Sequence, residues 1–287
     1  MSFLSAYLLY SLFLLLGLLP FRIFYAFSSL LAWFLNHIIG YRKKVTLANL
    51  ETIHFADAKA KSHALREIYK NLADIFLEGI RAFTISKKQI IRRHHILNPE
   101  LLDSYFESGR SMICVTGHYC NWEWGVFSAA LYTPFHIVGF YKPIQNKWLD
   151  RIVRNSRSRY GAELASIKET AKTFEKKWDR PVIYLMAADQ SPRKMDNAIR
   201  VKFLGRDTAF LHGPEKYSRQ YDHPVFYADI RRVKRGYYTL YLSIIADNPA
   251  SLPDGEVTRR FAEKLESVIR EEPSNWLWSH KRWKLNR

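Results

Sequence analysis

The chain has 287 residues, of which 48% are hydrophobic, so it can bury a substantial core in one large domain or two small ones. Its 44 Lys and Arg against 27 Asp and Glu give a formal charge of +17. Such a surplus points to anionic partners: nucleic acid, phosphorylated lipid, an anionic membrane or an acidic carrier protein. With only two cysteines, Cys114 and Cys120, a disulfide framework is excluded and a reducing compartment is favoured.

The N-terminal region is apolar. Residues 2–21 carry no charge, and a second apolar stretch covers residues 23–39. Twenty helical residues reach about 30 Å, the thickness of a bilayer core. The basic run at 42–44 favours a cytoplasmic position for the residues after it. We therefore predict a membrane anchor at 1–44, as one span with an interfacial helix or as a tight hairpin, before a catalytic domain at 45–287. A buried soluble helix is the alternative.

The remaining elements alternate between helix and strand. Residues 45–83 are expected to be largely helical because their apolar residues recur with a helical period. The expected strands are 111–116, 135–141, 182–188, 199–204, 224–231 and 236–245, and the expected helices are 121–131, 145–159, 168–178, 213–221 and 255–271. This order predicts an α/β fold with a mixed, mainly parallel sheet flanked by helices. The last two strands are expected to form a hairpin through residues 232–235.

The first of these strands leads into His118. A neutral imidazole can take a proton from an alcohol, and a nearby carboxylate can hold its tautomer and stabilise the imidazolium. Glu123 follows five positions later, where a helix is expected to begin. His118 and Glu123 are therefore a candidate general base and its orienting partner. Taken alone, a partly buried histidine that caps the turn explains the same residues.

Two further strands end in polar groups. The second expected strand is followed by Lys142 and Asn146, and the third by Asp189 and Gln190. Because active sites of open α/β sheets gather at the carboxyl ends of the strands, we expect these side chains to share a site with His118. An Asx-type turn is the simpler explanation of Asp189 and Gln190.

A basic stripe is expected on the helix at 145–159. Spacings of four, three and three place its members on one face; they are Lys147, Arg151, Arg154 and Arg157. Beside a catalytic histidine such a stripe suits a phosphorylated acceptor or an acidic donor, although a solvated surface also explains it. Arg159 lies beyond the stripe, where a surface salt bridge is the alternative.

Nucleic acid and metal are the weaker hypotheses. The basic residues are dispersed, and the sequence contains no helix-turn-helix, zinc-finger or RNP-like motif. A basic face held against an anionic leaflet accounts for the charge more simply, given the apolar N-terminus. The sequence also lacks the CxxC and HExxH spacings of metal sites. We expect no nucleic-acid partner and no metal.

Six segments, in order, are similar to blocks of one protein family. Residues 117–123 (GHYCNWE) resemble the GHxGNWE block of the bacterial lipid A late acyltransferases, the lauroyl and myristoyl transferases of the His-x4-Asp/Glu glycerolipid acyltransferase superfamily. The other similar segments are 141–146, 159–161, 188–190, 203–205 and 272–283. The chain departs from the family pattern at Cys120, where glycine is usual, and at Lys142, where arginine is commoner.

The resemblance implies a glycerolipid acyltransferase-like fold and an O-acyltransferase at the cytoplasmic face of the inner membrane. Such an enzyme would move a fatty acyl chain from acyl carrier protein, or from acyl-CoA, to a hydroxyl of a lipid A-type precursor. It would need no cofactor, because the thioester is already activated. His118 would remove the hydroxyl proton, and Glu123 would orient His118 and balance its charge.

The other site residues take their expected roles from the same resemblance. Donors to the oxyanion would come from Lys142, Asn146 or a backbone amide near Asn121. Phosphates or the acidic carrier would be bound by Lys147, Arg151, Arg154 and Arg159, while Asp189 and Gln190 would shape the acceptor or pantetheine pocket.

Three questions stay open at this stage. The acceptor could be another membrane lipid, such as a lysophospholipid, an aminolipid or a glycolipid. The protein could also be a non-catalytic, membrane-bound member of the fold. The C-terminal tryptophans Trp276, Trp278 and Trp283 could cap the core or form an interfacial aromatic belt.

Overall fold

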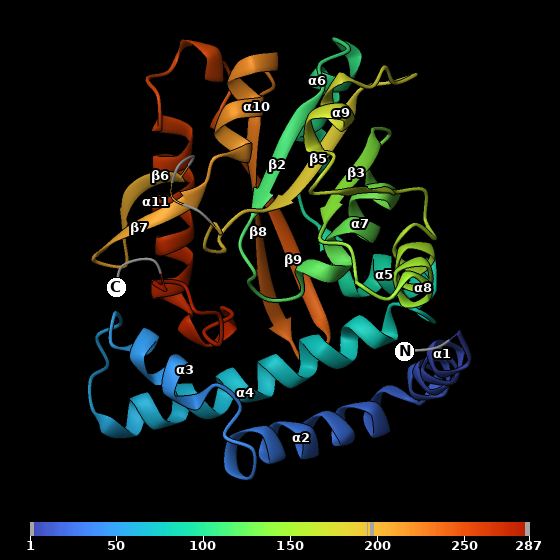
Figure 1. Cartoon of the computed structure of the whole chain (residues 1–287), viewed down its shortest axis with the longest axis vertical. Coiled ribbons are helices and arrows are strands. Elements are labelled where there is room, and N and C mark those ends of the chain that lie inside the picture. Colours follow the sequence, from blue (N-terminus) through green and yellow to red (C-terminus); the bar gives the residue numbers. More distant parts are fainter. Residues whose placement is uncertain (1–2, 194, 196–197, 285–287) are drawn as a thin grey trace.

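A seven-stranded sheet forms the centre of the computed structural model, which describes residues 3–193, 195 and 198–284 (Figure 1). Its strands are β1 (His94–Ile96), β2 (Met112–Thr116), β3 (His136–Tyr141), β4 (Glu163–Ser166), β5 (Val182–Ala187), β8 (Val225–Lys234) and β9 (Tyr237–Ala246). They lie in the order β1-β9-β8-β2-β5-β3-β4. Within these strands only the β8–β9 pair is antiparallel. The predicted mixed, mainly parallel sheet is confirmed.

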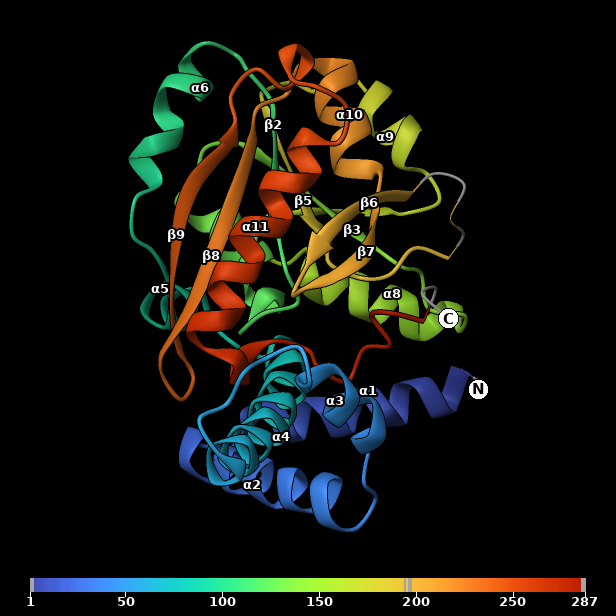
Figure 2. The same cartoon turned by 90° about the vertical axis from the view of Figure 1, so that its left-hand side faces the viewer.

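Helices cover both faces of this sheet and one of its ends (Figures 1 and 2). They are α1 (Phe3–Leu18), α2 (Phe21–His37), α3 (Lys43–Leu50), α4 (Ala58–Arg81), α5 (Lys87–Arg93), α6 (Asp103–Glu107), α7 (Gly125–Tyr132), α8 (Lys147–Arg157), α9 (Thr170–Glu175), α10 (Gly213–Tyr221) and α11 (Glu256–Glu271). Successive side chains of a strand point to opposite faces. Cys114 of β2 accordingly faces a cavity bordered by α7, whereas Val115 faces α10 and α11.

Residues 45–83 are largely helical, as predicted, and form α3 and α4. Asp57 caps the start of α4, where its side chain accepts from the Ala60 amide at 2.6 Å. Two other predictions about the elements were wrong in part. The strand expected at 199–204 is β6 (Ala198–Phe203), which leaves the main sheet and pairs with β7 (Arg206–Leu211) in a separate antiparallel ribbon. The β8–β9 hairpin is confirmed, but β8 continues to Lys234, so most of the expected connection is strand.

The first two helices form a bent pair against α4. A break of 118° separates them, and neither helix alone is long and apolar enough to cross a membrane, whereas the bent pair passes that test by length and composition. Phe13 of α1 packs on Phe83, and Phe24 of α2 is buried with Leu77 and Ile80 of α4. The outer faces expose apolar side chains, among them Leu4, Leu8, Leu12, Leu15, Phe27, Leu30 and Trp33. The domain boundary at residue 44 stays a prediction.

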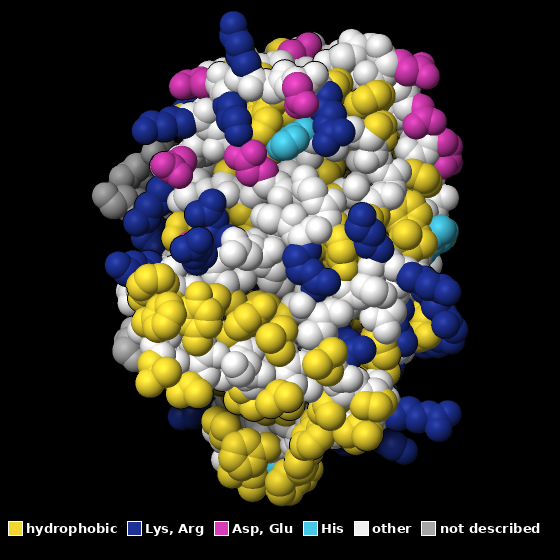
Figure 3. All heavy atoms as spheres, turned by 90° about the vertical axis from the view of Figure 1, so that its right-hand side faces the viewer, with side chains coloured by type: hydrophobic (Ala, Val, Ile, Leu, Met, Phe, Trp, Pro, Cys, Tyr) yellow, Lys and Arg dark blue, Asp and Glu magenta, His cyan; other side chains and the backbone are white. Residues whose placement is uncertain are grey.

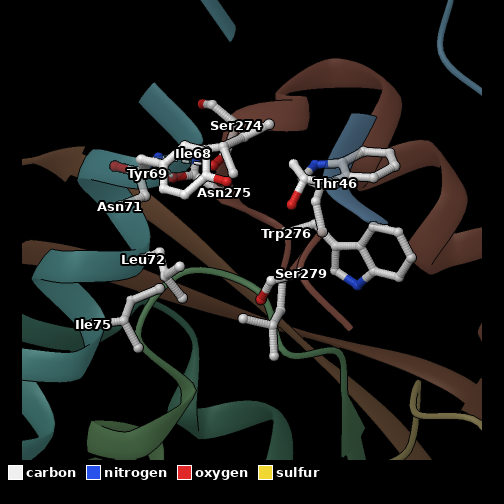
Figure 4. A pocket seen from close by; sticks show the side chains of 12 residues that line it. Thr46, Ile68, Tyr69, Asn71, Leu72, Ile75, Ser274, Asn275, Trp276 and Ser279 are labelled. Carbon is white, nitrogen blue, oxygen red and sulfur yellow. Dashed lines mark hydrogen bonds between the residues drawn. The ribbon is translucent and has the colours of Figure 1, made fainter. Parts of the chain in front are cut away.

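The C-terminal segment packs across α4 and into the core. Trp276 and Trp278 are 4% and 0% exposed, so the core-capping alternative holds for both. The amide of Asn71 on α4 donates to Asn275 at 2.9 Å beside a crevice of about 10 Å³ (Figure 4). That space holds roughly one water molecule, so it is a packing defect rather than a substrate site.

A buried ionic cluster joins α2, α4 and the β8–β9 hairpin. Asp74 of α4 is fully buried and accepts from Ser28 at 2.5 Å, Arg232 at 3.0 Å and Arg235 at 2.6 Å. A buried carboxylate needs such partners to offset its lost hydration. This cluster holds the helical layer to the sheet.

We expect Asp74→Ala to lower the free energy of unfolding by about 3 kcal/mol or more, because it leaves two arginines without their buried counter-charge. Urea unfolding followed by tryptophan fluorescence in detergent measures the loss. The control is Asp247→Ala, which removes an exposed carboxylate from its partly exposed partner Arg110 and should cost less than about 1 kcal/mol. Equal losses in the two variants would contradict this account.

Candidate active site

Strand register brings His118 and Asp189 together. β2 and β5 are parallel neighbours in which Thr116 lies opposite Ala187. His118 and Asp189 each follow two residues later, so both leave the same edge of the sheet at the same level. The structure thus brings these two residues into direct contact.

The imidazole of His118 is held on both of its nitrogens. Nδ1 lies 2.5 Å from Oδ1 of Asp189, and Nε2 lies 3.0 Å from the amide nitrogen of Gln190. Because the Gln190 amide can only donate, Nε2 must accept, and the proton of neutral His118 resides on Nδ1. The second oxygen of Asp189 accepts from the His118 backbone amide at 2.9 Å and from the Trp276 indole at 2.7 Å. His118 is thus set in the tautomer that a general base requires.

Electrostatics favour a strong base at this position. Burial works against the imidazolium, but the Asp189 carboxylate, through charge and hydrogen bond, outweighs burial and raises the pKa of His118. For Asp189, burial raises the pKa, while the charge of His118 and hydrogen bonds from His118 and Trp276 bring that pKa down to about 2. Asp189 is therefore ionised at neutral pH, although its side chain is only 3% exposed.

Glu123 binds a different partner. Its carboxylate lies 2.5 Å from the guanidinium of Arg157, the last residue of α8, and acts on His118 through its charge alone. Both ends of this ion pair are partly buried. The indole of Trp122 packs edge-on against the His118 ring at 4.9 Å. In the structure, the contact that sequence analysis expected from Glu123 is made by Asp189.

A cavity of about 850 Å³ opens at His118. Polar lining residues include Glu123, Lys142, Arg157 and Gln190. The apolar part of the lining, called the arm below, consists of Ile96, Leu102, Met112, Cys114, Ala129, Phe226, Ile230, Leu240 and Leu242. Along β2 the lining residues alternate through Met112, Cys114 and Thr116 to His118, a run of about 20 Å. The arm has the length and chemistry to hold a hydrocarbon chain.

Three expected site residues have structural partners. Asn121 is 0% exposed, and its amide donates to Glu78 of α4 at 2.7 Å. Asn146 caps α8 by accepting from the Leu149 amide at 3.0 Å. Arg159 donates to the carbonyl oxygen of Phe83 at 2.6 Å. These three side chains therefore stabilise the backbone and helices around the cavity.

The basic stripe divides between two surroundings. Arg157 lines the cavity, whereas Lys147, Arg151 and Arg154 are exposed on α8. Lys142 is exposed and also lines the cavity. Among the described residues, the Lys and Arg side chains that line the cavity are Lys142, Arg157, Arg193 and Lys284.

Sequence analysis missed the C-terminal contribution to the site. Trp276 holds Asp189, and His280 and Lys284 line the cavity. These residues lie more than 80 positions from Asp189, so no local spacing connects them. The similarity of residues 272–283 to a family block was the available signal. No group of three His, Cys, Asp or Glu in residues 3–193, 195 and 198–284 is arranged to hold a metal.

Cys120, the departure from the family's glycine, has an unusual backbone. Its φ is +50°, in the left-handed region where glycine has no steric cost. Cys120 is also fully buried. The family preference for glycine thus has a conformational reason at this position, and the surrounding contacts must hold the cysteine in place.

The His118–Asp189 pair thus lies in the lining of a large, partly apolar cavity on an α/β sheet. In a comparison with protein families, the bacterial lipid A biosynthesis acyltransferase pattern matches residues 2–285. The chain belongs to this family and is an acyltransferase. Among individual curated proteins, none matches the chain.

We expect activity to rise with pH and to level off above the pKa of His118, which lies above the ordinary 6.5, because the base must be unprotonated. Asp189→Asn removes the group that raises this pKa. The acid limb should therefore move to lower pH while the limiting rate falls by about 10²-fold or more. Rates across pH 5 to 9 measure both changes.

Glu123→Gln serves as the comparison for this profile. It removes a charge that acts on His118 at longer range, together with the ionic partner of Arg157, so the acid limb should move in the same direction by a smaller amount. A larger shift from Glu123→Gln than from Asp189→Asn would reverse the assignment of the two carboxylates.

Proposed function

We propose that this protein is a membrane-associated O-acyltransferase that moves a fatty acyl chain from acyl carrier protein, or from acyl-CoA, to a hydroxyl of a lipid A-type precursor. One observation carries the proposal. His118, with Asp189 on Nδ1, lies in the lining of the 850 Å³ cavity, and much of the remaining lining is apolar. A base at this place can activate a hydroxyl beside a thioester whose chain occupies the arm.

The residues divide the chemical work. Nε2 of His118 takes the proton of the acceptor hydroxyl while the hydroxyl oxygen attacks the thioester carbonyl. Asp189 stabilises the imidazolium, and the tetrahedral oxyanion is met by donors from Gln190 and Lys142, which both line the cavity. The thiolate then leaves and takes the proton back from His118. Glu123 adds negative charge that favours the imidazolium and fixes Arg157 in the cavity wall.

The basic surface suits both substrates. Lys142 and Arg193 are exposed at the cavity, and Arg151 and Arg154 are exposed on α8. An acidic carrier protein and a phosphorylated lipid would both be steered to such a surface. Charge complementarity of this kind acts mainly on the rate of encounter and on partner choice.

The apolar faces of α1 and α2 suit the cytoplasmic leaflet of the inner membrane. Figure 3 shows apolar side chains in a band at the lower end of the molecule, with Lys and Arg side chains directly above it. Apolar faces buried in the interface and basic residues at anionic headgroups reinforce each other. The acceptor, itself a membrane lipid, would reach the site from the same side.

The decisive test is lipid mass spectrometry on cells with the gene deleted, restored, or restored as His118→Ala. We expect deletion to remove one acyl chain from lipid A, and only the wild type to restore it. The control is His54→Ala, an exposed histidine far from the cavity in sequence, which should restore the chain fully. A change in another lipid instead of lipid A would identify that lipid as the acceptor. Unchanged lipids in every strain would contradict the transferase.

We expect Cys114→Trp to shift the transferred chains to shorter lengths, because the indole would fill part of the arm. The same mass spectra report the chain length. Cys114→Ala is the matched control and should keep the wild-type length, since it only enlarges the arm at this point. Wild-type chain lengths from a stably folded Cys114→Trp protein would show that the arm does not hold the acyl chain.

A further inference from the structure

We propose that Glu78 is a positioning residue for His118. Through the hydrogen bond between Tyr25 and Glu78, the packing of α2 would then control the geometry of the catalytic loop, residues 117–124. The kinetic part of this inference rests on the proposed acyl transfer. A second readout, the reactivity of a loop cysteine, does not.

Glu78 is a fully buried carboxylate at which three elements meet. Its Oε1 accepts from the Tyr25 hydroxyl of α2 at 2.7 Å. Its Oε2 accepts from the Asn121 amide of the loop and from the Tyr238 hydroxyl of β9, each at 2.7 Å. Burial of a carboxylate is unfavourable unless such donors are fixed in place. Glu78 therefore links the sheet, α2 and the loop through one side chain.

Asn121 connects Glu78 to the backbone of the loop. It follows His118 by three residues, and its Oδ1 accepts from the Trp124 amide at 3.0 Å. Its carbonyl oxygen lies 3.2 Å from Nε2 of His94. Burial lowers the pKa of His94 to about 4, so this ring is neutral and donates through Nε2. Glu78 is thus one of the few groups on which the middle of the loop depends.

The loop needs anchors because its backbone is strained. Cys120, with φ at +50°, lies between His118 and Asn121. On one side the loop is held by the C-terminal segment, where the Cys120 amide donates to Asn275 and the Leu277 amide donates to His118, each at 3.0 Å. On the other side it is held by Glu78. Loss of either anchor lets the strained residue relax and moves the imidazole.

The β8–β9 turn leaves space for the side chain of Tyr25. A Cβ added to Gly236, in the β8–β9 turn, would lie 2.1 Å from the Tyr25 hydroxyl oxygen, so only glycine leaves room for it. The Arg235 guanidinium lies over the Tyr25 ring at 4.8 Å. Phe27 and Leu30 of the same helix are exposed and apolar. A surface that binds these side chains would therefore act on the helix that carries Tyr25.

The test compares variants of the full-length protein in detergent with acyl carrier protein thioester and a lipid A precursor. Glu78→Met removes all three hydrogen bonds, and we expect kcat to fall roughly 10-fold to 100-fold with KM nearly unchanged, as for a small displacement of the base. Tyr25→Phe removes one of these hydrogen bonds, and we expect kcat to fall roughly threefold to tenfold. Glu78→Gln keeps an acceptor for Asn121 and Tyr238 and should recover most of the rate.

Alkylation of the two cysteines gives the independent readout. Cys120 lies in the loop and is fully buried, so a loosened loop should raise its rate of reaction with a maleimide. Cys114, in β2, is the internal reference and should not change. Tyr241→Phe, an exposed tyrosine on β9, is the matched control and should alter neither rate nor labelling.

The outcomes separate the two hypotheses. Wild-type kcat and wild-type Cys120 labelling in Tyr25→Phe would overturn the positioning role, even if Glu78→Met failed to fold. A rise in KM alone would overturn it as well, because the contact would then serve substrate binding. If the wild type transferred no acyl chain, the proposed function would fail, while Cys120 labelling would still decide whether α2 controls the loop.

Discussion

The site depends on the parallel pairing of β2 with β5. Because Thr116 and Ala187 are opposite each other, the residues two positions further on, His118 and Asp189, meet at the edge of the sheet without any long loop to position them. The rest of the site is arranged around this contact. Gln190 follows on the same strand end, and Trp276 closes on the second oxygen of Asp189. A slip of one residue in the register would turn one of the pair to the other face.

The two carboxylates near His118 differ through their surroundings. Asp189 is almost fully buried and receives three hydrogen bonds, two of them from His118, so its charge acts strongly on the imidazole. Glu123 is paired with Arg157, and the guanidinium offsets much of its charge. A sequence motif that contains a histidine and a carboxylate therefore does not by itself define a hydrogen-bonded pair, since the chain between them can carry the carboxylate to another partner.

The catalytic loop is held from outside the sheet. Glu78 of α4 and the C-terminal segment contact it from two sides, and α4 in turn carries the bent pair of α1 and α2 (Figure 2). Helix α2, which exposes several apolar side chains, is therefore only one side chain, Glu78, away from the loop. The packing of α2 on α4 and the anchoring of the loop share one buried polar layer, which includes the Asp74 cluster.

The sequence by itself determined the α/β class, most strands and helices, the family and the candidate base, because hydrophobic period and motif order are local properties. It did not determine the departure of β6 from the sheet or the partner of His118. Those depend on contacts between distant residues: Asp189 is 71 positions from His118, and Glu78 is 43 from Asn121. Only the tertiary structure decided these pairs, because burial and strand register choose among several carboxylates that the sequence leaves equivalent.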